Sequence, residues 1–250
     1  TGPYRDRAGF ARLFEAMGGL TYITGEPEGA PMHTGYPMGD AIGGLFGTIG
    51  VLAALCRRVM EPDAPGEEID LSMTEAVLRL LDFLPIEHDQ LGEVRERSGN
   101  ANQYSAPSAV YSSRDGRYVS LSGSTNAIFV ANARSIGRPD LPEDPRFMTN
   151  SLRMGYSAEL NEVFSRWMGE HTLDEILEAF EREGGAIAPI YSSDQIVNDP
   201  QMVAREAIVS VPDADFGSVR MQNVVPRFVS NPGAVRSTAG TLGEYNQDFY

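Results

Sequence analysis

The chain has 250 residues, of which 42% are hydrophobic, and it carries a formal net charge of −15 at pH 7. All 20 basic residues are arginine, which excludes a P-loop lysine, a Schiff-base lysine or a lysine general base within this stretch. Phosphate neutralisation needs clustered basic residues, so the acidic balance argues against a nucleic-acid partner. The length is sufficient to bury a substantial core in one or two domains.

Cysteine and histidine usage argues against a metal site. Cys56 is the single cysteine and lies in the apolar run VLAALCRRV, where a small buried core residue is the favoured interpretation. His33, His88 and His171 are too widely spaced for a metal-ligand pattern, so we expect no metal. We find no signal-peptide pattern and no apolar run of about 18 residues, so we expect a cytoplasmic location and no membrane partner.

Helical periodicity dominates the first 60 residues. Residues 8–18 carry Phe10, Leu13, Phe14 and Met17 at helical spacing and end at a glycine pair, which predicts a short amphipathic helix. A loop rich in glycine and proline follows over 24–39. The helical pattern over 40–60 contains an unusual set of small residues, namely Gly43, Gly44, Gly47, Gly50, Ala53 and Ala54. Each glycine costs a helix up to about 1 kcal/mol relative to alanine, so we expect another element to pack very close to this helix.

Beyond residue 60, helix and strand patterns alternate, which is typical of a mixed α/β fold. We predict strands at 68–72, 109–112, 118–121 and 186–191, and helices at 73–84, 125–136, 156–169 and 173–183. Pro85 should stop the helix at 73–84, and the Asp-Gly pair of 113–116 should form a hairpin turn. Thr172 and Glu175 have the spacing of a capping box. The charged stretch 87–97 is a plausible connection between domains, and short strands and turns are expected after 191.

Asp40 is the carboxylate that invites a chemical interpretation. It follows a glycine, ends the loop and opens the small-residue helix, so a helix N-cap is the structural interpretation. A carboxylate at a helix N-terminus beside glycines is also sterically open, and the helix dipole favours its ionised, nucleophilic form. The two interpretations are compatible, and the residues alone do not choose between them. The chain has no G-x-S-x-G motif, and its glycines lie inside a helical pattern rather than in a dinucleotide-binding loop.

An ordered set of segments resembles the family III CoA transferases, the group that includes formyl-CoA transferase and carnitine CoA transferase. The segments are GPYRDRAGF, EAMGGLTYITGEPEGAP, GYPMGDAIGGLFGTIGVLAAL and GEEIDLSMTEA, followed by AVYSSRDGRYVSLSG and SSDQIVNDPQMVARE. The resemblance implies transfer of CoA from an acyl-CoA thioester to a small carboxylic acid through a covalent aspartyl-CoA intermediate. Asp40 matches the family's catalytic aspartate. CoA enters as a substrate, and the resemblance implies no permanently bound cofactor.

The resemblance also points to a loop that supplies oxyanion-stabilising N–H groups. The corresponding residues here are Gly99, Asn100, Ala101, Asn102 and Gln103, within SGNANQYSAP. This segment has fewer glycines than the mobile loop of formyl-CoA transferase. An ordinary polar inter-domain loop is the alternative interpretation.

Two rival functions remain at this stage. The α-methylacyl-CoA racemases of the same superfamily use a histidine and an aspartate, and the histidine would fall at Phe10. Phenylalanine cannot accept a proton, so the racemase interpretation lacks its base. The second rival is a non-catalytic paralogue that binds acyl-CoA, against which the presence of Asp40 argues.

The resemblance implies an α/β architecture with a Rossmann-like large domain and a smaller α+β domain, in an interlocked homodimer. We predict that residues 1–97 form the first part of the large domain, 98–190 the small domain, and 191–250 the return to the large domain. The chain starts without methionine and ends just after a polar stretch, so we expect a piece of a longer protein. Most CoA-binding residues would then precede residue 1.

Overall fold

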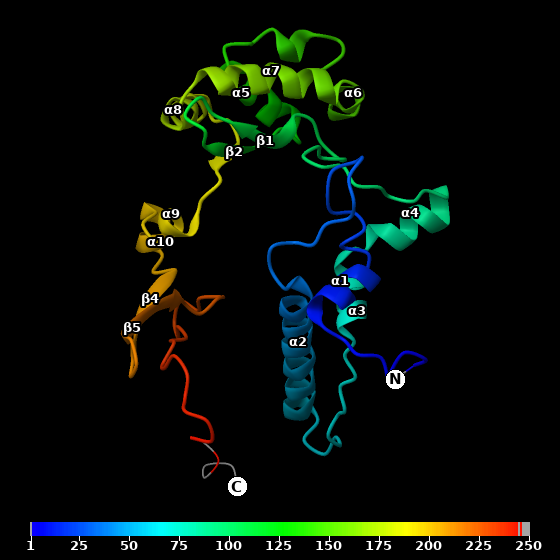
Figure 1. The fold of residues 1–250 in the computed structure, drawn as a ribbon, viewed down its shortest axis with the longest axis vertical. Helices are drawn as coiled ribbons and strands as arrows, with labels where there is room; N and C mark the ends of the chain where they lie inside the picture. Colours follow the sequence, from blue (N-terminus) through cyan, green and yellow to red (C-terminus); the bar gives the residue numbers. More distant parts are fainter. Residues whose placement is uncertain (1, 245, 247–250) are drawn as a thin grey trace. The chain divides into compact units, whose positions relative to one another are not determined.

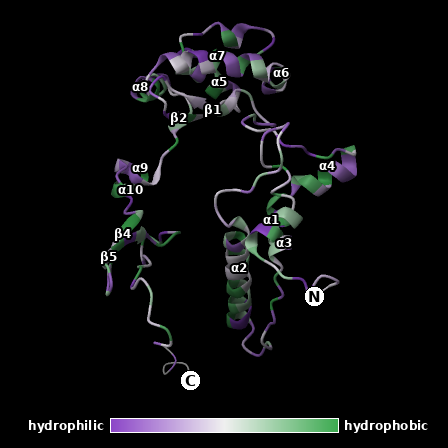
Figure 2. Cartoon of the chain, viewed as in Figure 1, coloured by the Kyte–Doolittle hydropathy of each residue, from purple (hydrophilic) through white to green (hydrophobic). Residues whose placement is uncertain are grey.

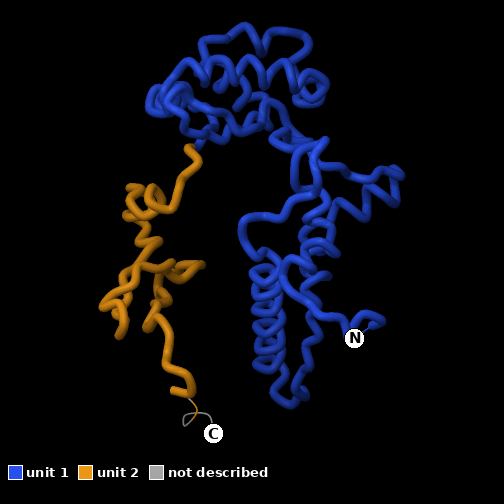
Figure 3. The backbone as a smooth tube through the Cα atoms, in the orientation of Figure 1, with its two compact units in different colours: residues 1–188 blue, residues 189–250 orange. Residues whose placement is uncertain are grey.

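The computed structural model describes residues 2–244 and 246. Its fold is mixed α/β, and the chain divides into two compact units, Thr1–Ala188 and Pro189–Tyr250 (Figures 1 and 3). Within the first unit, two separate hydrophobic clusters form, one among residues 20–84 and the other among residues 109–187.

Four helices make up the first region: α1 (Ala11–Met17), α2 (Met38–Met60), α3 (Met73–Leu80) and α4 (Phe83–Leu91). The expected close neighbour of the glycine-rich helix is the segment that leads into α3. A Cβ placed at Gly43, Gly47 or Gly50 would lie 3.1–3.4 Å from the side chains of Met73, Leu71 and Ile69, respectively. Three apolar residues at alternate positions thus lie along the glycine face of α2.

The predicted strand at 68–72 is therefore wrong. Its alternating apolar residues contact a helix rather than a sheet, and these residues are not assigned to a strand. The predicted stop at Pro85 is also wrong, because α3 ends at Leu80 and Pro85 is the third residue of α4. The N–H groups of a first helical turn have no helical acceptor, so proline is tolerated there.

Most of α2 is exposed. Its apolar side chains at Leu45, Ile49, Leu52 and Val59 are exposed. The ribbon of α2 carries green, hydrophobic bands in Figure 2. Cys56 is exposed as well, so its prediction as a buried core residue is wrong. By length and composition α2 could cross a membrane, although core helices of soluble proteins meet the same criterion. The buried residues of this region are few, and Ile42, Ala76, Val77 and Leu81 form its cluster.

A small sheet begins the second region, with the strand order β1 (Ser108–Ser112), β2 (Tyr118–Ser122), β3 (Ile187–Pro189). The strands β1 and β2 pair antiparallel, with Tyr111 opposite Val119, and the turn between them contains the Asp-Gly pair. The predicted hairpin is confirmed. Gly116 in this turn has φ of +74°, a conformation that favours glycine.

Helices enclose the core beside this sheet. They are α5 (Asn126–Ser135), α6 (Asn150–Gly155), α7 (Ser157–Glu170) and α8 (Leu173–Glu183), with a 3-10 turn η1 at Leu141–Glu143. Phe129, Leu160, Phe164, Ile176 and Phe180 are almost completely buried at the centre of the cluster. The three predicted helices are confirmed, and so is the capping box of Thr172 and Glu175. The sequence prediction missed α6 and η1.

Arg153 is fully buried beside this core. Its guanidinium donates hydrogen bonds to the carbonyl oxygens of Ala106, Phe147 and Gly123 at 2.6–3.3 Å and to Asn126 at 3.0 Å. Burial lowers the pKa of this guanidinium. The Arg153 side chain therefore joins three backbone carbonyls and one side-chain oxygen around the start of β1.

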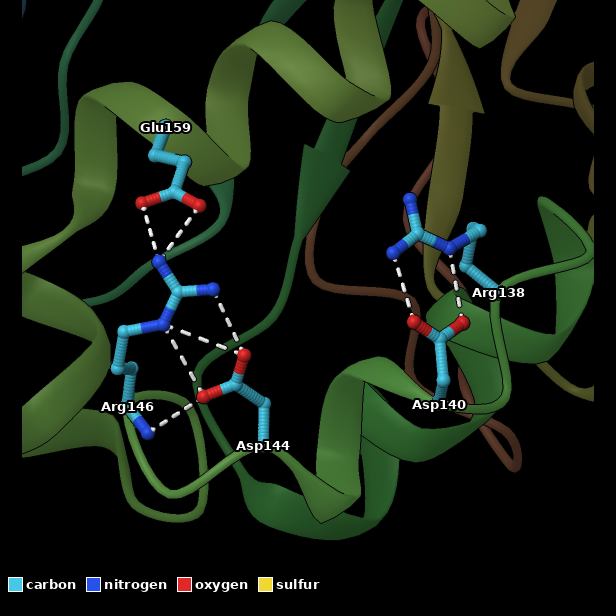
Figure 4. Close-up of polar contacts among 5 residues, drawn as sticks. All are labelled: Arg138, Asp140, Asp144, Arg146 and Glu159. Carbon is cyan, nitrogen blue, oxygen red and sulfur yellow. Dashed lines mark hydrogen bonds and ion pairs between the residues drawn. The ribbon is translucent and has the colours of Figure 1, made fainter.

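Ion pairs lie on the surface of the same region (Figure 4). Arg146 contacts Asp144 at 2.7 Å and Glu159 of α7 at 2.8 Å, and Arg138 contacts Asp140 at 2.7 Å. The arginine lowers the pKa of its aspartate in both Asp140 and Asp144. Exposed pairs of this kind contribute about 0–1 kcal/mol each, so the buried core dominates the stability of this region.

The second unit carries two short helices, α9 (Ser193–Ile196) and α10 (Pro200–Ala204), and the antiparallel hairpin β4 (Ile208–Asp213) and β5 (Gly217–Gln222). Short elements were expected after residue 191, although the two helices were not foreseen. Val211 is the one buried hydrophobic residue that the described part of this unit contains.

Candidate active site

Asp40 lies in the first turn of α2, with its side chain exposed. The helix begins at Met38 after Pro37, so Asp40 is the third helical residue and the predicted N-cap role is wrong. A carboxylate in the first turn still benefits from the positive end of the helix dipole. Asp40 thus remains an accessible carboxylate at the N-terminal end of the helix.

The first turn of α2 contacts α1 through small residues. A Cβ at Gly39 would lie 2.9 Å from the carbonyl oxygen of Ala11, so no larger residue fits without movement. The buried face of α1 therefore contains Ala11 and Glu15, whereas Phe10 before the helix is 74% exposed and Leu13 and Met17 in it are also exposed. The predicted apolar face of this helix is wrong, because the close contact with α2 is made by Ala11 and by Glu15, which accepts a hydrogen bond from Gly39.

Glu15 is a site residue that sequence reasoning missed. Its side chain is buried, and its Oε1 accepts a hydrogen bond from the backbone N–H of Gly39 at 3.1 Å. Its Oε2 lies 3.7 Å from Nδ1 of His33, which belongs to the loop before α2. The available signal was an acidic residue four positions after Ala11 in a short helix, since positions i and i+4 share one face.

The five predicted loop residues, Gly99 to Gln103, lie between α4 and β1 and are exposed. Asn100 forms a two-way contact with β1: its Nδ2 donates to the carbonyl of Val110 at 2.7 Å, and its Oδ1 accepts from the Val110 N–H at 2.8 Å. Asn102 accepts from the N–H groups of Tyr104 and Ser105. Side-chain amides therefore hold this loop where the sequence has fewer glycines than expected.

The same loop contacts the glycine-rich loop that precedes α2. The Gly99 N–H donates to the carbonyl of Gly25 at 2.9 Å, and Gly99 has φ of +55° with Glu26 close to its Cα. The segment leading into it is held by Tyr22, whose hydroxyl donates to Glu96 at 2.6 Å, and this hydrogen bond raises the tyrosine pKa. Arg97 donates to the Tyr22 carbonyl. Two loops far apart in sequence thus lie together.

The described residues show no hydrogen bond or ion pair between Asp40 and residues 99–103. The chain instead connects them through the loop 24–37, which contacts Gly99 at one end and enters α2 at the other. Asn100 and Ala101 also line a surface hollow of about 550 Å³ with Val110 and the α7 residues Asn161 and Arg166. Among residues 2–244 and 246, no group of three potential metal-binding side chains comes together.

Asp40 is thus an exposed carboxylate in the first turn of a glycine-rich helix, within a mixed α/β protein. The amino-acid sequence matches the family described as CoA-transferase family III over residues 1–246. The chain belongs to this family, and the resemblance inferred from its sequence segments is confirmed.

The relatives are CoA-transferases of several specificities. The chain is 36% identical over 250 residues to succinyl-CoA–D-citramalate CoA-transferase of Chloroflexus aurantiacus, covering 100% of this chain and 62% of that protein. It is 34% identical over 251 residues to the beta subunit of succinyl-CoA–L-malate CoA-transferase of the same organism, covering 99% and 62%. Formyl-CoA:oxalate CoA-transferase of Streptomyces avermitilis is 28% identical, with 100% and 64% covered. The chain spans about three fifths of the length of these relatives.

The solved structures agree on the fold. A CaiB/BaiF family protein from Brucella suis superimposes with a TM-score of 0.81 at 27% identity, over 99% of this chain and 64% of that one. A Mycobacterium tuberculosis protein has a TM-score of 0.82 at 23% identity and shows a shared fold. The mixed α/β architecture is thereby confirmed.

Proposed function

We propose that the protein containing this chain transfers coenzyme A from an acyl-CoA thioester to a carboxylic acid, with Asp40 as the acylated residue. The observation that carries the proposal is the position of Asp40, exposed in the first turn of a glycine-rich helix in a chain of family III. A carboxylate at this position lies at the positive end of the helix dipole and is open to a ligand.

The proposed steps balance without an oxidant, a reductant or water. The Asp40 carboxylate attacks the thioester carbonyl, the C–S bond breaks, and CoA thiolate leaves a mixed anhydride. The thiolate then attacks the Asp40 carbonyl and releases the donor acid, which leaves an aspartyl-CoA thioester. The acceptor carboxylate attacks this thioester and expels CoA thiolate, and attack of the thiolate on the acceptor carbonyl of the new anhydride yields the product thioester and free Asp40.

The loop Gly99 to Gln103 is the proposed source of backbone N–H donors to the oxyanions of these steps. The N–H groups of Gly99 and Ala101 donate to the carbonyls of Gly25 and Ser98 in this structure, so their part in this role requires those hydrogen bonds to open. Preorganised donors stabilise developing charge without reorganisation, and the amide contacts of Asn100 and Asn102 supply such order to the loop. This role requires the loop to reach Asp40 in the complete enzyme. The proposal also includes an interlocked homodimer and a cytoplasmic location. Light scattering of the native enzyme tests whether it is a dimer.

Succinyl-CoA with a hydroxylated dicarboxylic acid is the first substrate pair to test. The two relatives described at 34–36% identity are named for succinyl-CoA as donor and for citramalate or malate as acceptor. A panel should pair succinyl-CoA with D-citramalate, L-malate and oxalate, and product thioesters should be separated by liquid chromatography. The proposal predicts exchange with at least one acceptor acid and consumption of donor and acceptor in equal amounts.

Asp40→Ala should abolish this exchange and leave the enzyme folded. Loss of a first-turn carboxylate costs a helix about 0.3–1 kcal/mol, too little to unfold a domain. Circular dichroism and thermal unfolding provide the folding control. Substantial transfer by the folded variant would remove Asp40 from the mechanism.

Proton exchange separates this proposal from the racemase rival. Phe10 occupies the position where the racemase histidine would lie, and phenylalanine has no group to accept a proton. We expect no uptake of deuterium into the α-position of a 2-methylacyl-CoA above background, measured by mass spectrometry in heavy water. Rapid uptake would favour the racemase branch.

A further inference from the structure

The helix that carries Asp40 has no N-cap of its own. Pro37 precedes its first residue and offers no side-chain acceptor, although the first N–H groups of any helix lack intrahelical partners. Glu15 of α1 fills this role from 24 positions upstream, since its Oε1 accepts the Gly39 N–H at 3.1 Å. The contact is buried, and its acceptor side chain is 1% exposed.

The second oxygen of Glu15 connects the same point to the preceding loop. Nδ1 of His33 lies 3.7 Å from Oε2, and the Oγ1 of Thr21 is 3.5 Å from that same nitrogen. Glu15 of α1 therefore contacts both the loop before α2, at His33, and the first turn of α2, at Gly39. A buried carboxylate without such partners would be costly, so its presence here needs the helix N-terminus and the imidazole beside it.

A steric contact reinforces the hydrogen bond. Gly39 packs so closely on α1 that a Cβ would lie 2.9 Å from the Ala11 carbonyl oxygen, whereas a Cβ at Gly44 would meet nothing within 4 Å. Gly39, whose N–H donates to Glu15, is thus also a position with no room for a side chain. Both contacts fix the residue directly before Asp40.

We propose that Glu15 is a positioning residue for Asp40, acting through its hydrogen bond to the Gly39 N–H. The inference rests on the proposed function of Asp40. Glu15 itself is buried and takes no part in the chemistry. Its effect is to hold the first turn of α2, and hence the nucleophilic carboxylate, in one place, where a misplacement of about 1 Å can cost two orders of magnitude in rate.

The test compares four variants in the enzyme that contains this chain. Glu15→Ala removes the acceptor, Glu15→Gln retains a side-chain oxygen at the same place, Gly39→Ala forces the helices apart, and Gly44→Ala is the control on the same helix. Measurements are kcat and KM with succinyl-CoA, the fraction of sites that carry the covalent CoA adduct, and the unfolding midpoint. Expressing kcat per labelled site removes the contribution of unfolded enzyme.

We expect Glu15→Ala and Gly39→Ala to lower kcat per labelled site by at least about tenfold with little change in KM, because the nucleophile is misplaced after substrate has bound. Glu15→Gln should stay within about threefold of the parent, since an amide oxygen also accepts the Gly39 N–H. Gly44→Ala should match the parent.

Four results would overturn the inference, and two of them require Asp40→Asn as a fifth variant. Parental kcat per labelled site in Glu15→Ala, with a lowered unfolding midpoint alone, would reduce Glu15 to a structural residue. Equal losses in Glu15→Gln and Glu15→Ala would show that the hydrogen bond is not the basis of the effect. Full activity of Asp40→Asn would overturn the proposed function and this inference together, whereas inactive Asp40→Asn with fully active Glu15→Ala would overturn the inference alone.

Discussion

The two regions of the first unit differ in how completely they bury their own apolar residues. The sheet and helices between Ser108 and Pro189 enclose a core in which whole aromatic side chains are inaccessible to solvent. The region of α1 to α4 buries a small cluster and leaves most of the 23-residue α2 exposed. The region from Ser108 to Pro189 buries its core within these residues, whereas the region of α1 to α4 leaves many apolar side chains exposed.

The exposed apolar side chains of α2 indicate that the proposed chemistry at Asp40 should depend on contacts beyond those within α1 to α4. Exposed apolar patches larger than a few hundred Å² generally mark an interaction surface. Asp40 lies in the first turn of α2, which carries exposed apolar side chains, whereas the predicted oxyanion loop is anchored to β1 through Asn100. The stability of the two regions should therefore respond differently to equivalent substitutions.

The largest expected difference comes from removing one apolar side chain in each region. Phe164→Ala should destabilise the 250-residue chain by about 3–5 kcal/mol, since the ring is fully buried. Leu52→Ala on the exposed face of α2 should change it by less than about 0.5 kcal/mol. Urea unfolding monitored by circular dichroism measures both. Similar losses in the two variants would show that α2 is covered in solution.

A smaller effect should follow from Arg153→Met. The substitution leaves the carbonyl oxygens of Ala106, Phe147 and Gly123 without their buried donor and should cost about 2–4 kcal/mol. Arg166→Met is the matched control, because the Arg166 side chain is 70% exposed and pairs with Glu162 at the surface. Equal unfolding midpoints for the two variants would contradict the structural role of Arg153.

The smallest effect concerns the capping box at the start of α8. Hydrogen bonds from the backbone N–H and the side chain of Thr172 lower the pKa of Glu175. A lowered carboxyl pKa adds stability above the unfolded-state pKa, and this contribution is lost as the pH falls through the folded-state value. The parent should thus exceed Glu175→Gln in unfolding midpoint at pH 7, and the gap should close as the pH falls below about 4.3. A gap that persists at low pH would exclude the carboxylate charge as its cause.

Local sequence patterns predicted the region from Ser108 to Pro189 well. The Asp-Gly turn and the Thr172–Glu175 capping box involve residues close in sequence, and the structure contains both. Their geometry depends on neighbouring backbone groups, which a sequence displays directly. The fold class and family could likewise be predicted, because ordered segments along the whole chain carry them.

Contacts between distant residues could not be predicted in the same way. The alternation at Ile69, Leu71 and Met73 resembled a strand, yet these side chains fill the glycine face of α2. Glu15 was not singled out, because its burial depends on the contact between α1 and α2 at Gly39. Alternating apolar residues and charged residues indicate which positions are buried and which are solvated. They do not identify the element that a buried side chain contacts. The sequence indicated Asp40 as the candidate residue and predicted its helix, but it did not indicate Glu15, which accepts a hydrogen bond from the first turn of that helix.

Covalent labelling of Asp40 is the most direct test of the proposed mechanism. The enzyme is incubated with succinyl-CoA, quenched in acid and digested with trypsin, which should release Leu13–Arg57 as one peptide because no basic residue lies between Arg12 and Arg57. We predict a fraction of this peptide heavier by CoA minus one water, with fragmentation placing the addition on Asp40. The addition on Glu15, Glu26 or Glu28, or active transfer with no labelled peptide under any quench, would contradict the account.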